Sequence, residues 1–237
     1  MNIKNTLINF TLLFVCLFGI VLIFNEPIQA YFIKKASEEV MDNRPLDADT
    51  MLANNEIDAS FDFDSVESLT LGDIFSLKSM ASYVSVIGQI AVPSVNLHLP
   101  IGKGVSETVL ATGAGTLKED QQLGKGNYAL ASHNLEGTDV LFSPLHHAQI
   151  GDAVYLTDLA HVYTYEITVA EVIPPTATYV LDDIPNKTLL TLITCAFDGE
   201  ERLHIQAKLT ATTAIDNATQ EMKDAFQLQQ NHTKKRD

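Results

Sequence analysis

The sequence predicts an all-β domain that follows an apolar N-terminal segment. Short segments rich in β-branched and aromatic residues recur between 81 and 211, and most of them show partial alternation. Gly, Pro, Asn or Asp separate these segments, and only two stretches have the Ser start and Gly stop of a short helix. We therefore expect a closed barrel or a sandwich. The expected strands are 83–92, 95–101, 127–133, 153–158, 161–173, 188–194 and 202–210, and the expected short helices are 106–115 and 143–151.

The first element is a charge-free run over residues 7–24, "LINFTLLFVCLFGIVLIF". As a helix it spans roughly 27 Å, close to the thickness of a bilayer core. It therefore predicts a single transmembrane signal anchor, with residues 1–6 as a short cytoplasmic N-terminus and the rest of the chain outside the cell. A cleaved signal peptide and a buried soluble helix are the alternatives, and "IQA" at 28–30 matches a cleavage site only weakly.

The segments on either side of the β-rich region read as accessories. Residues 25–80 are acidic with patchy hydrophobicity, which favours an extended extracellular stalk or linker with short helices around 34–41 and 65–78. Residues 212–237 form a polar C-terminal tail that we expect to fray beyond the domain. The formal net charge of −15 argues against nucleic acid as a partner, because phosphate binding requires clustered Lys and Arg.

The chain contains two cysteines, and only Cys195 lies outside the apolar segment. A single thiol in an oxidising compartment is either an inert buried residue or a reactive nucleophile. The connection "AFDGEE" after Cys195 contains Asp-Gly, which predicts a hairpin with Cys195 and Arg202 at its mouth. The guanidinium could favour the thiolate or stabilise an oxyanion. A surface arginine paired with Glu200 or Glu201 is the alternative.

A cysteine nucleophile also needs a group that transfers protons, and this group is usually histidine. His133 is the preferred candidate because it ends the strand "NYALAS", where a rigid scaffold places reactive side chains. His146, His147 and His204 stay open as weaker candidates.

Taken together, "TLITC" at 191–195, the following Arg202 and the upstream "NYALASHN" resemble a class A sortase, a membrane-anchored cysteine transpeptidase of Gram-positive bacteria. The wider runs "IAVPSVNLHLPIGKGVSETVLATGAGTL" and "LFSPLHHAQIGDAVYLTD" support the resemblance, which covers 81–211 and extends to the anchor. It implies an eight-stranded sortase-type β-barrel over residues 81–211, with Cys195, His133 and Arg202 as catalytic residues and Thr194 as a substrate contact.

The resemblance also implies substrates. The first substrates are surface proteins with an LPxTG sorting signal, which the enzyme cleaves between Thr and Gly through a thioacyl-enzyme. The second substrate is the amine of a peptidoglycan precursor (lipid II), which acts as the acceptor. No cofactor or metal is expected, because no carboxylates here match those of the calcium-responsive branch of the family. The lid and the second hydrophobic segment of the pilin-polymerising class C relatives are not visible in the sequence. A non-catalytic, membrane-tethered β-domain that binds wall components and a hydrolytic cysteine peptidase are the alternative functions.

Overall fold

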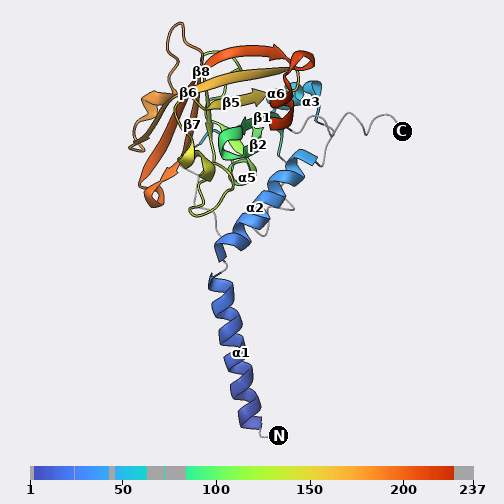
Figure 1. Ribbon diagram of the computed structural model, residues 1–237, viewed down its shortest axis with the longest axis vertical. Coiled ribbons are helices and arrows are strands. Elements are labelled where there is room, and N and C mark those ends of the chain that lie inside the picture. Colours follow the sequence, from blue (N-terminus) through green and yellow to red (C-terminus); the bar gives the residue numbers. More distant parts are fainter. Residues whose placement is uncertain (1–2, 24, 43–45, 63–71, 73–83, 227–237) are drawn as a thin grey trace, which may run out of the picture.

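A closed barrel of eight strands forms the body of the described chain, in the order β1-β2-β3-β4-β7-β8-β6-β5 (Figure 1). The computed structural model describes all residues except 1–2, 24, 43–45, 63–71, 73–83 and 227–237. The β2–β3 and β4–β7 pairs are parallel and the other pairs are antiparallel. The all-β prediction is confirmed, and a barrel rather than a sandwich is found. The strands are β1 (Val86–Val92), β2 (Leu97–Gly102), β3 (Ala114–Thr116), β4 (Asn127–Ala131), β5 (Ala153–Thr157), β6 (His161–Ile173), β7 (Leu189–Ala196) and β8 (Glu201–Ala214).

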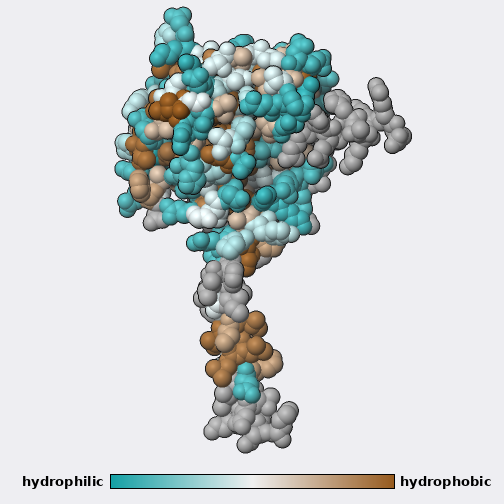
Figure 2. All heavy atoms as spheres, viewed as in Figure 1, coloured by the Kyte–Doolittle hydropathy of each residue, from teal (hydrophilic) through white to brown (hydrophobic). Residues whose placement is uncertain are grey.

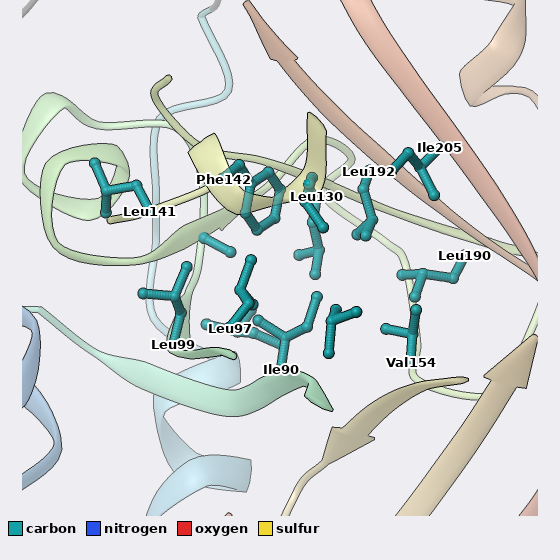
Figure 3. Packing of buried hydrophobic residues seen from close by; sticks show 14 of the residues in the cluster. Ile90, Leu97, Leu99, Leu130, Leu141, Phe142, Val154, Leu190, Leu192 and Ile205 are labelled. Atoms are coloured by element: carbon teal, nitrogen blue, oxygen red, sulfur yellow. The ribbon is translucent and has the colours of Figure 1, made fainter. Parts of the chain in front are cut away.

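Apolar side chains from most of these strands fill the barrel and point toward one another (Figure 3). Alternate residues of β7 and β8, such as Leu190, Leu192 and Ile205, face this core, so their neighbours in sequence face outward. Each fully buried side chain of this size contributes about 1.5–3 kcal/mol through burial alone. The interior is thus a packed core, and any site must lie on the outer face or at the strand ends.

The helices lie outside the barrel. They are α1 (Ile3–Ile23), α2 (Asn25–Asp42), α3 (Ala48–Asn55), α5 (Glu107–Thr112) and α6 (Gln220–Ala225), with 3₁₀ turns η3 (Pro93–Val95), η4 (Ser143–His147), η5 (Thr178–Leu181), η6 (Phe197–Gly199) and η7 (Ile215–Asn217). The helix expected over 106–115 ends earlier, because the chain turns at Gly113 into the short strand β3, which the sequence did not predict. The second expected helix is the 3₁₀ turn η4.

The stalk predicted over 25–80 is wrong where the structure describes it. In α2, Ile33, Ala36, Ser37 and Val40 are buried at helical spacing, and Ile33 belongs to the main core. Next in the chain, α3 packs against β1, where the Asn54 side chain donates to the Val86 carbonyl at 2.8 Å. The apolar stripe, rather than the overall acidity, decides the position of this segment. The short helix expected around 65–78 lies almost wholly outside the described residues.

The C-terminal segment also packs on the barrel as far as Phe226, which corrects the prediction of a fraying tail from 212. Strand β8 continues to Ala214, and α6 then buries Met222 against Tyr155 and Val162. Tyr155 donates a hydrogen bond to Glu221 at 2.9 Å. The rest of the predicted tail, 227–237, lies outside the described residues.

At the N-terminus, α1 projects away from the barrel below α2 (Figure 1). Its exposed side chains are largely apolar and include Leu7, Phe10, Phe14 and Leu17. Figure 2 shows a brown, hydrophobic band on this part of the molecule. Within the described part of the chain, no helix has the length and apolarity needed to cross a bilayer. The predicted transmembrane helix over 7–24 is therefore not supported by the structure.

Candidate active site

Cys195 and Arg202 face each other across the hairpin of β7 and β8. Cys195 is paired with Arg202 in the antiparallel register, and η6 connects the two strands. This confirms the hairpin that the Asp-Gly signal predicted. Nη1 of Arg202 donates to the carbonyls of Gly199 at 2.8 Å and Glu201 at 3.0 Å. The guanidinium therefore bonds the backbone of its own loop rather than the carboxylates of Glu200 or Glu201, and is held at the hairpin mouth.

His133 reaches the same place through the parallel pairing of β4 with β7. Ala131 is the register partner of Ile193, and the amide of Ser132 donates to the Ile193 carbonyl at 3.3 Å. Parallel strands end at the same edge of a sheet, so the next residue on each outer face, His133 and Cys195, lies at that shared edge. The structure thus brings His133, Cys195 and Arg202 to one end of β4, β7 and β8.

The His133 imidazole is held in an environment that disfavours charge. Its Nε2 atom is buried and has no hydrogen-bond partner among the described residues. Burial lowers the pKa of His133 from 6.5 to about 4, because the positive form loses solvation. The ring is therefore neutral at pH 7 and can accept a proton. Cys195 is a free thiol, and the residue is half-buried.

Thr194, the predicted substrate contact, lies on the inner side of the same strand end. Its side chain is buried, and its hydroxyl donates to the Ser132 carbonyl at 2.7 Å. This bond ties the end of β7 to the end of β4 and so fixes the positions of the neighbouring His133 and Cys195. A substrate contact by Thr194 stays a prediction.

Two further side chains hold the main chain at Cys195, and the sequence did not identify this role for either. Nδ2 of Asn134 donates to the Cys195 carbonyl at 3.0 Å, and Nε2 of His146 lies 3.3 Å from the same oxygen. Asn134 directly follows the predicted His133, which is the only sequence signal for it. His146 was considered as a proton-transfer group, but its contact here is with the backbone of the cysteine.

His204 lies two residues beyond Arg202 on the same face of β8. Its ring is buried, and Nδ1 lies 3.2 Å from Oε1 of Glu171 on β6. His204 pairs with Ile193 in the register, so it lies two residues farther from the hairpin end of β8 than Arg202 does. His147 is exposed on η4.

An apolar cluster adjoins this strand end on the outside of the barrel. Buried Ala129 and Ala131 of β4 pack with Val105, Leu110 and Leu117, and the cluster also includes half-buried Leu181 and Ile193. Ala131 and Ile193 are two residues before His133 and Cys195 on the same faces. No group of three or more His, Cys, Asp or Glu side chains within the described ranges is arranged to hold a metal ion.

Comparison with known proteins defines the class. The sortase domain family matches residues 90–210, and the chain belongs to the sortase family. Sortase A of Streptococcus agalactiae serotype III (strain NEM316) is 41% identical over 219 residues, which cover 90% of this chain and 88% of that protein. Sortase A of Listeria monocytogenes serovar 1/2a (strain ATCC BAA-679 / EGD-e) is 38% identical over 184 residues, which cover 76% and 81%.

The solved structures agree with the sequence relatives. The crystal structure of Listeria monocytogenes sortase A matches with a TM-score of 0.55 and 36% identity, over 60% of this chain and 96% of that one. Within the family, these relatives support a class A sortase, a cysteine transpeptidase. The resemblance stated from the sequence is confirmed, and a non-catalytic wall-binding domain is not favoured.

Proposed function

We propose that this sortase cleaves LPxTG sorting signals between Thr and Gly and joins the surface protein to a wall amine, with Cys195, His133 and Arg202 as the catalytic residues. The observation that carries the proposal is the convergence of these three residues at one end of β4, β7 and β8. Cys195 and Arg202 lie on the outer face of β7 and β8, and His133 lies two residues beyond the end of β4. A cysteine with a nearby neutral histidine and a fixed cation is the arrangement that acyl transfer requires.

The first half of the reaction forms a thioester. The neutral His133 takes the thiol proton as Sγ of Cys195 attacks the threonine carbonyl carbon. The C–N bond to glycine then breaks, and His133 gives the same proton to the leaving amine. Since burial keeps the resting imidazole neutral, the thiol is the source of that proton.

The second half returns the enzyme to its starting state. The acceptor amine attacks the thioester carbonyl and loses a proton to His133, and the proton passes to the departing sulfur. Arg202 stabilises the negative oxygen in both halves, or holds the substrate backbone. Its two bonds to the loop carbonyls keep the guanidinium in place without occupying all five of its N–H groups.

The apolar cluster around Ala131 and Ile193 suits the leucine and proline of the sorting signal. It begins two residues before His133 and Cys195, so a peptide that lies along it places a later carbonyl at the sulfur. Val105 lies between β2 and α5, and Leu181 ends η5, so different connections between strands contribute to this cluster. We expect substitutions here to change the KM of the peptide more than its kcat.

We also infer that the enzyme is held at the outer face of the cell membrane, with its N-terminus in the cytoplasm and lipid II as the amine donor. The charge-free run over 7–24 and the exposed apolar side chains of α1 support this part of the proposal. Fractionation of cells that express the full chain tests it. Recovery of the protein with the soluble fraction would contradict it.

The catalytic assignment is tested with an LPxTG peptide and mass spectrometry of the products. Cys195→Ala should abolish cleavage, and His133→Ala and Arg202→Ala should reduce it about a hundredfold or more, as for loss of a general base or an oxyanion donor. Near-normal turnover by Arg202→Ala, or activity of His133→Ala but not of His204→Ala, would refute it. A methanethiosulfonate reagent on a Cys16→Ser background should label Cys195, whereas an inert buried thiol would stay unmodified.

A further inference from the structure

A large cavity lies next to the strand ends that carry the proposed catalytic residues. None of the residues that line it belongs to the apolar cluster. Its volume is about 1130 Å³, and it lies between the first half of α2, η3, the loop after β4, and η4. Two of its lining residues, Asn134 and His146, are the ones whose side chains hydrogen-bond the Cys195 carbonyl. The cavity wall therefore touches the main chain of the nucleophile.

The charge of this cavity is mixed, with an excess of carboxylates. Glu136 and Asp139 line it, against the single ammonium of Lys34, and both carboxylates are exposed and form no ion pair with any described residue. Glu26 adds a third carboxylate nearby, because its Oε2 lies 3.3 Å from the position that a Cβ on Gly137 would take. Exposed carboxylates that line a large cavity and have no ion-pair partner among the described residues favour a cationic ligand.

The position of the cavity relative to the chain is also informative. Its α2 residues, Pro27, Ala30, Tyr31 and Lys34, lie in the part of α2 nearer to α1 in the chain. If α1 marks the membrane side, as proposed above, the cavity opens on the side from which a membrane-linked acceptor arrives. The apolar cluster, by contrast, suits the leucine and proline of the sorting signal.

We propose that this cavity, here called the α2 cavity, binds the second substrate, a peptide with a protonated primary amine that becomes the nucleophile of the transfer step. Glu136 and Asp139 attract the ammonium, Lys34 opposes it, and Asn134 and His146 form the passage to the thioester. The bound ammonium first releases one proton to solvent. The free amine then attacks the carbonyl carbon and passes a second proton through His133 to the departing sulfur. This inference rests on the proposed function and adds to it the place where the acceptor is selected.

The test measures transfer and hydrolysis separately on the full chain, in detergent micelles. An LPxTG peptide at saturation forms the thioacyl-enzyme, and alanyl-alanine amide is titrated as the acceptor. Glu136→Gln/Asp139→Asn should raise the KM for the amine about fivefold to tenfold at low salt. Lys34→Gln should lower this KM about twofold. The rate of hydrolysis without acceptor and the KM for the LPxTG peptide should not change in either variant.

The matched control is Glu119→Gln/Asp216→Asn, which removes the same two charges away from the cavity and should leave the KM for the amine unchanged. If the control raised the KM for the amine as much as the cavity variant does, the loss of net charge alone would explain both results, and the inference would be overturned. Normal transfer by the wild type with an unchanged KM in both cavity variants would also overturn it, and would leave the proposed function standing. Failure of the wild type to cleave the LPxTG peptide would remove both.

Discussion

The depressed pKa of His133 predicts a measurable dependence of stability on pH. In the unfolded chain this ring has a pKa near 6.5, whereas burial lowers it to about 4 in the folded protein. Between these values the unfolded state binds a proton that the native state does not, so stability is complete above pH 6.5 and falls as the pH drops toward 4. The difference of about 2.5 units corresponds to about 3 kcal/mol, an upper value because the ring is partly exposed.

Replacing His133 with Asn removes this contribution. The free energy of unfolding, measured with urea at several pH values between 4 and 7, should fall less steeply in His133→Asn than in the wild type, by up to about 3 kcal/mol over the range. His98 has a similarly lowered pKa of about 4 from burial, so the wild-type curve contains two such rings. The His98→Asn variant is the matched control, since it should flatten the curve in the same way but retain cleavage of the LPxTG peptide.

NMR of the histidine ring carbons separates the two contributions. The resonance that disappears in His133→Asn should titrate near pH 4 in the wild-type protein. A midpoint at 6.5 or above, or parallel stability curves for wild type and variant, would refute the lowered pKa of His133. A midpoint well above 7 would also mean that the ring is charged in the resting enzyme. The thiol would then no longer be needed as the source of the leaving-group proton.

Three further predictions concern the elements around the site. Phe197 has a φ of 47°, so Phe197→Gly should be more stable toward urea than Phe197→Ala by about 1 kcal/mol, and equal stability would refute strain at this loop. Lys118 binds Asp183 at 2.7 Å and the Leu181 carbonyl at 3.1 Å, so Lys118→Met should raise the KM for the LPxTG peptide about threefold with little change in kcat; an unchanged KM would contradict this. Met222→Ala should lower the free energy of unfolding by about 2–3 kcal/mol, and a loss under about 0.5 kcal/mol would show that α6 is not docked.

The sequence predicted the parts of the site that depend on local pattern. Alternation along 202–210 and the Asp-Gly signal were enough to place Cys195 opposite Arg202, because a short hairpin fixes its own register. A polar residue that ends an apolar strand made His133 the preferred proton-transfer candidate, and the resemblance to class A sortases implied the same residue. The three-residue strand β3 was missed because it is too short to show any period.

The contacts that depend on distant segments could not be predicted. Asn134 and His146 bind the Cys195 carbonyl across the fold, and no spacing in the sequence connects them. The apolar stripe of α2 is visible as Ile33, Ala36 and Val40, but the surrounding acidity suggested a spacer. Whether such a stripe docks depends on a partner surface that only the folded barrel provides.

The β4–β7 register is the feature on which the proposed catalytic arrangement depends most. Adjacent parallel strands end together, so this pairing brings His133 to Cys195 although the two lie far apart in the sequence. The period of two also makes the pairing stringent, because a slip of one residue would turn Cys195 inward and Thr194 outward. The bond from Thr194 to the Ser132 carbonyl opposes such a slip, and it would be lost if the register moved. We therefore infer that the buried Thr194 stabilises the β4–β7 register, which keeps Cys195 on the outer face beside His133 in the proposed site.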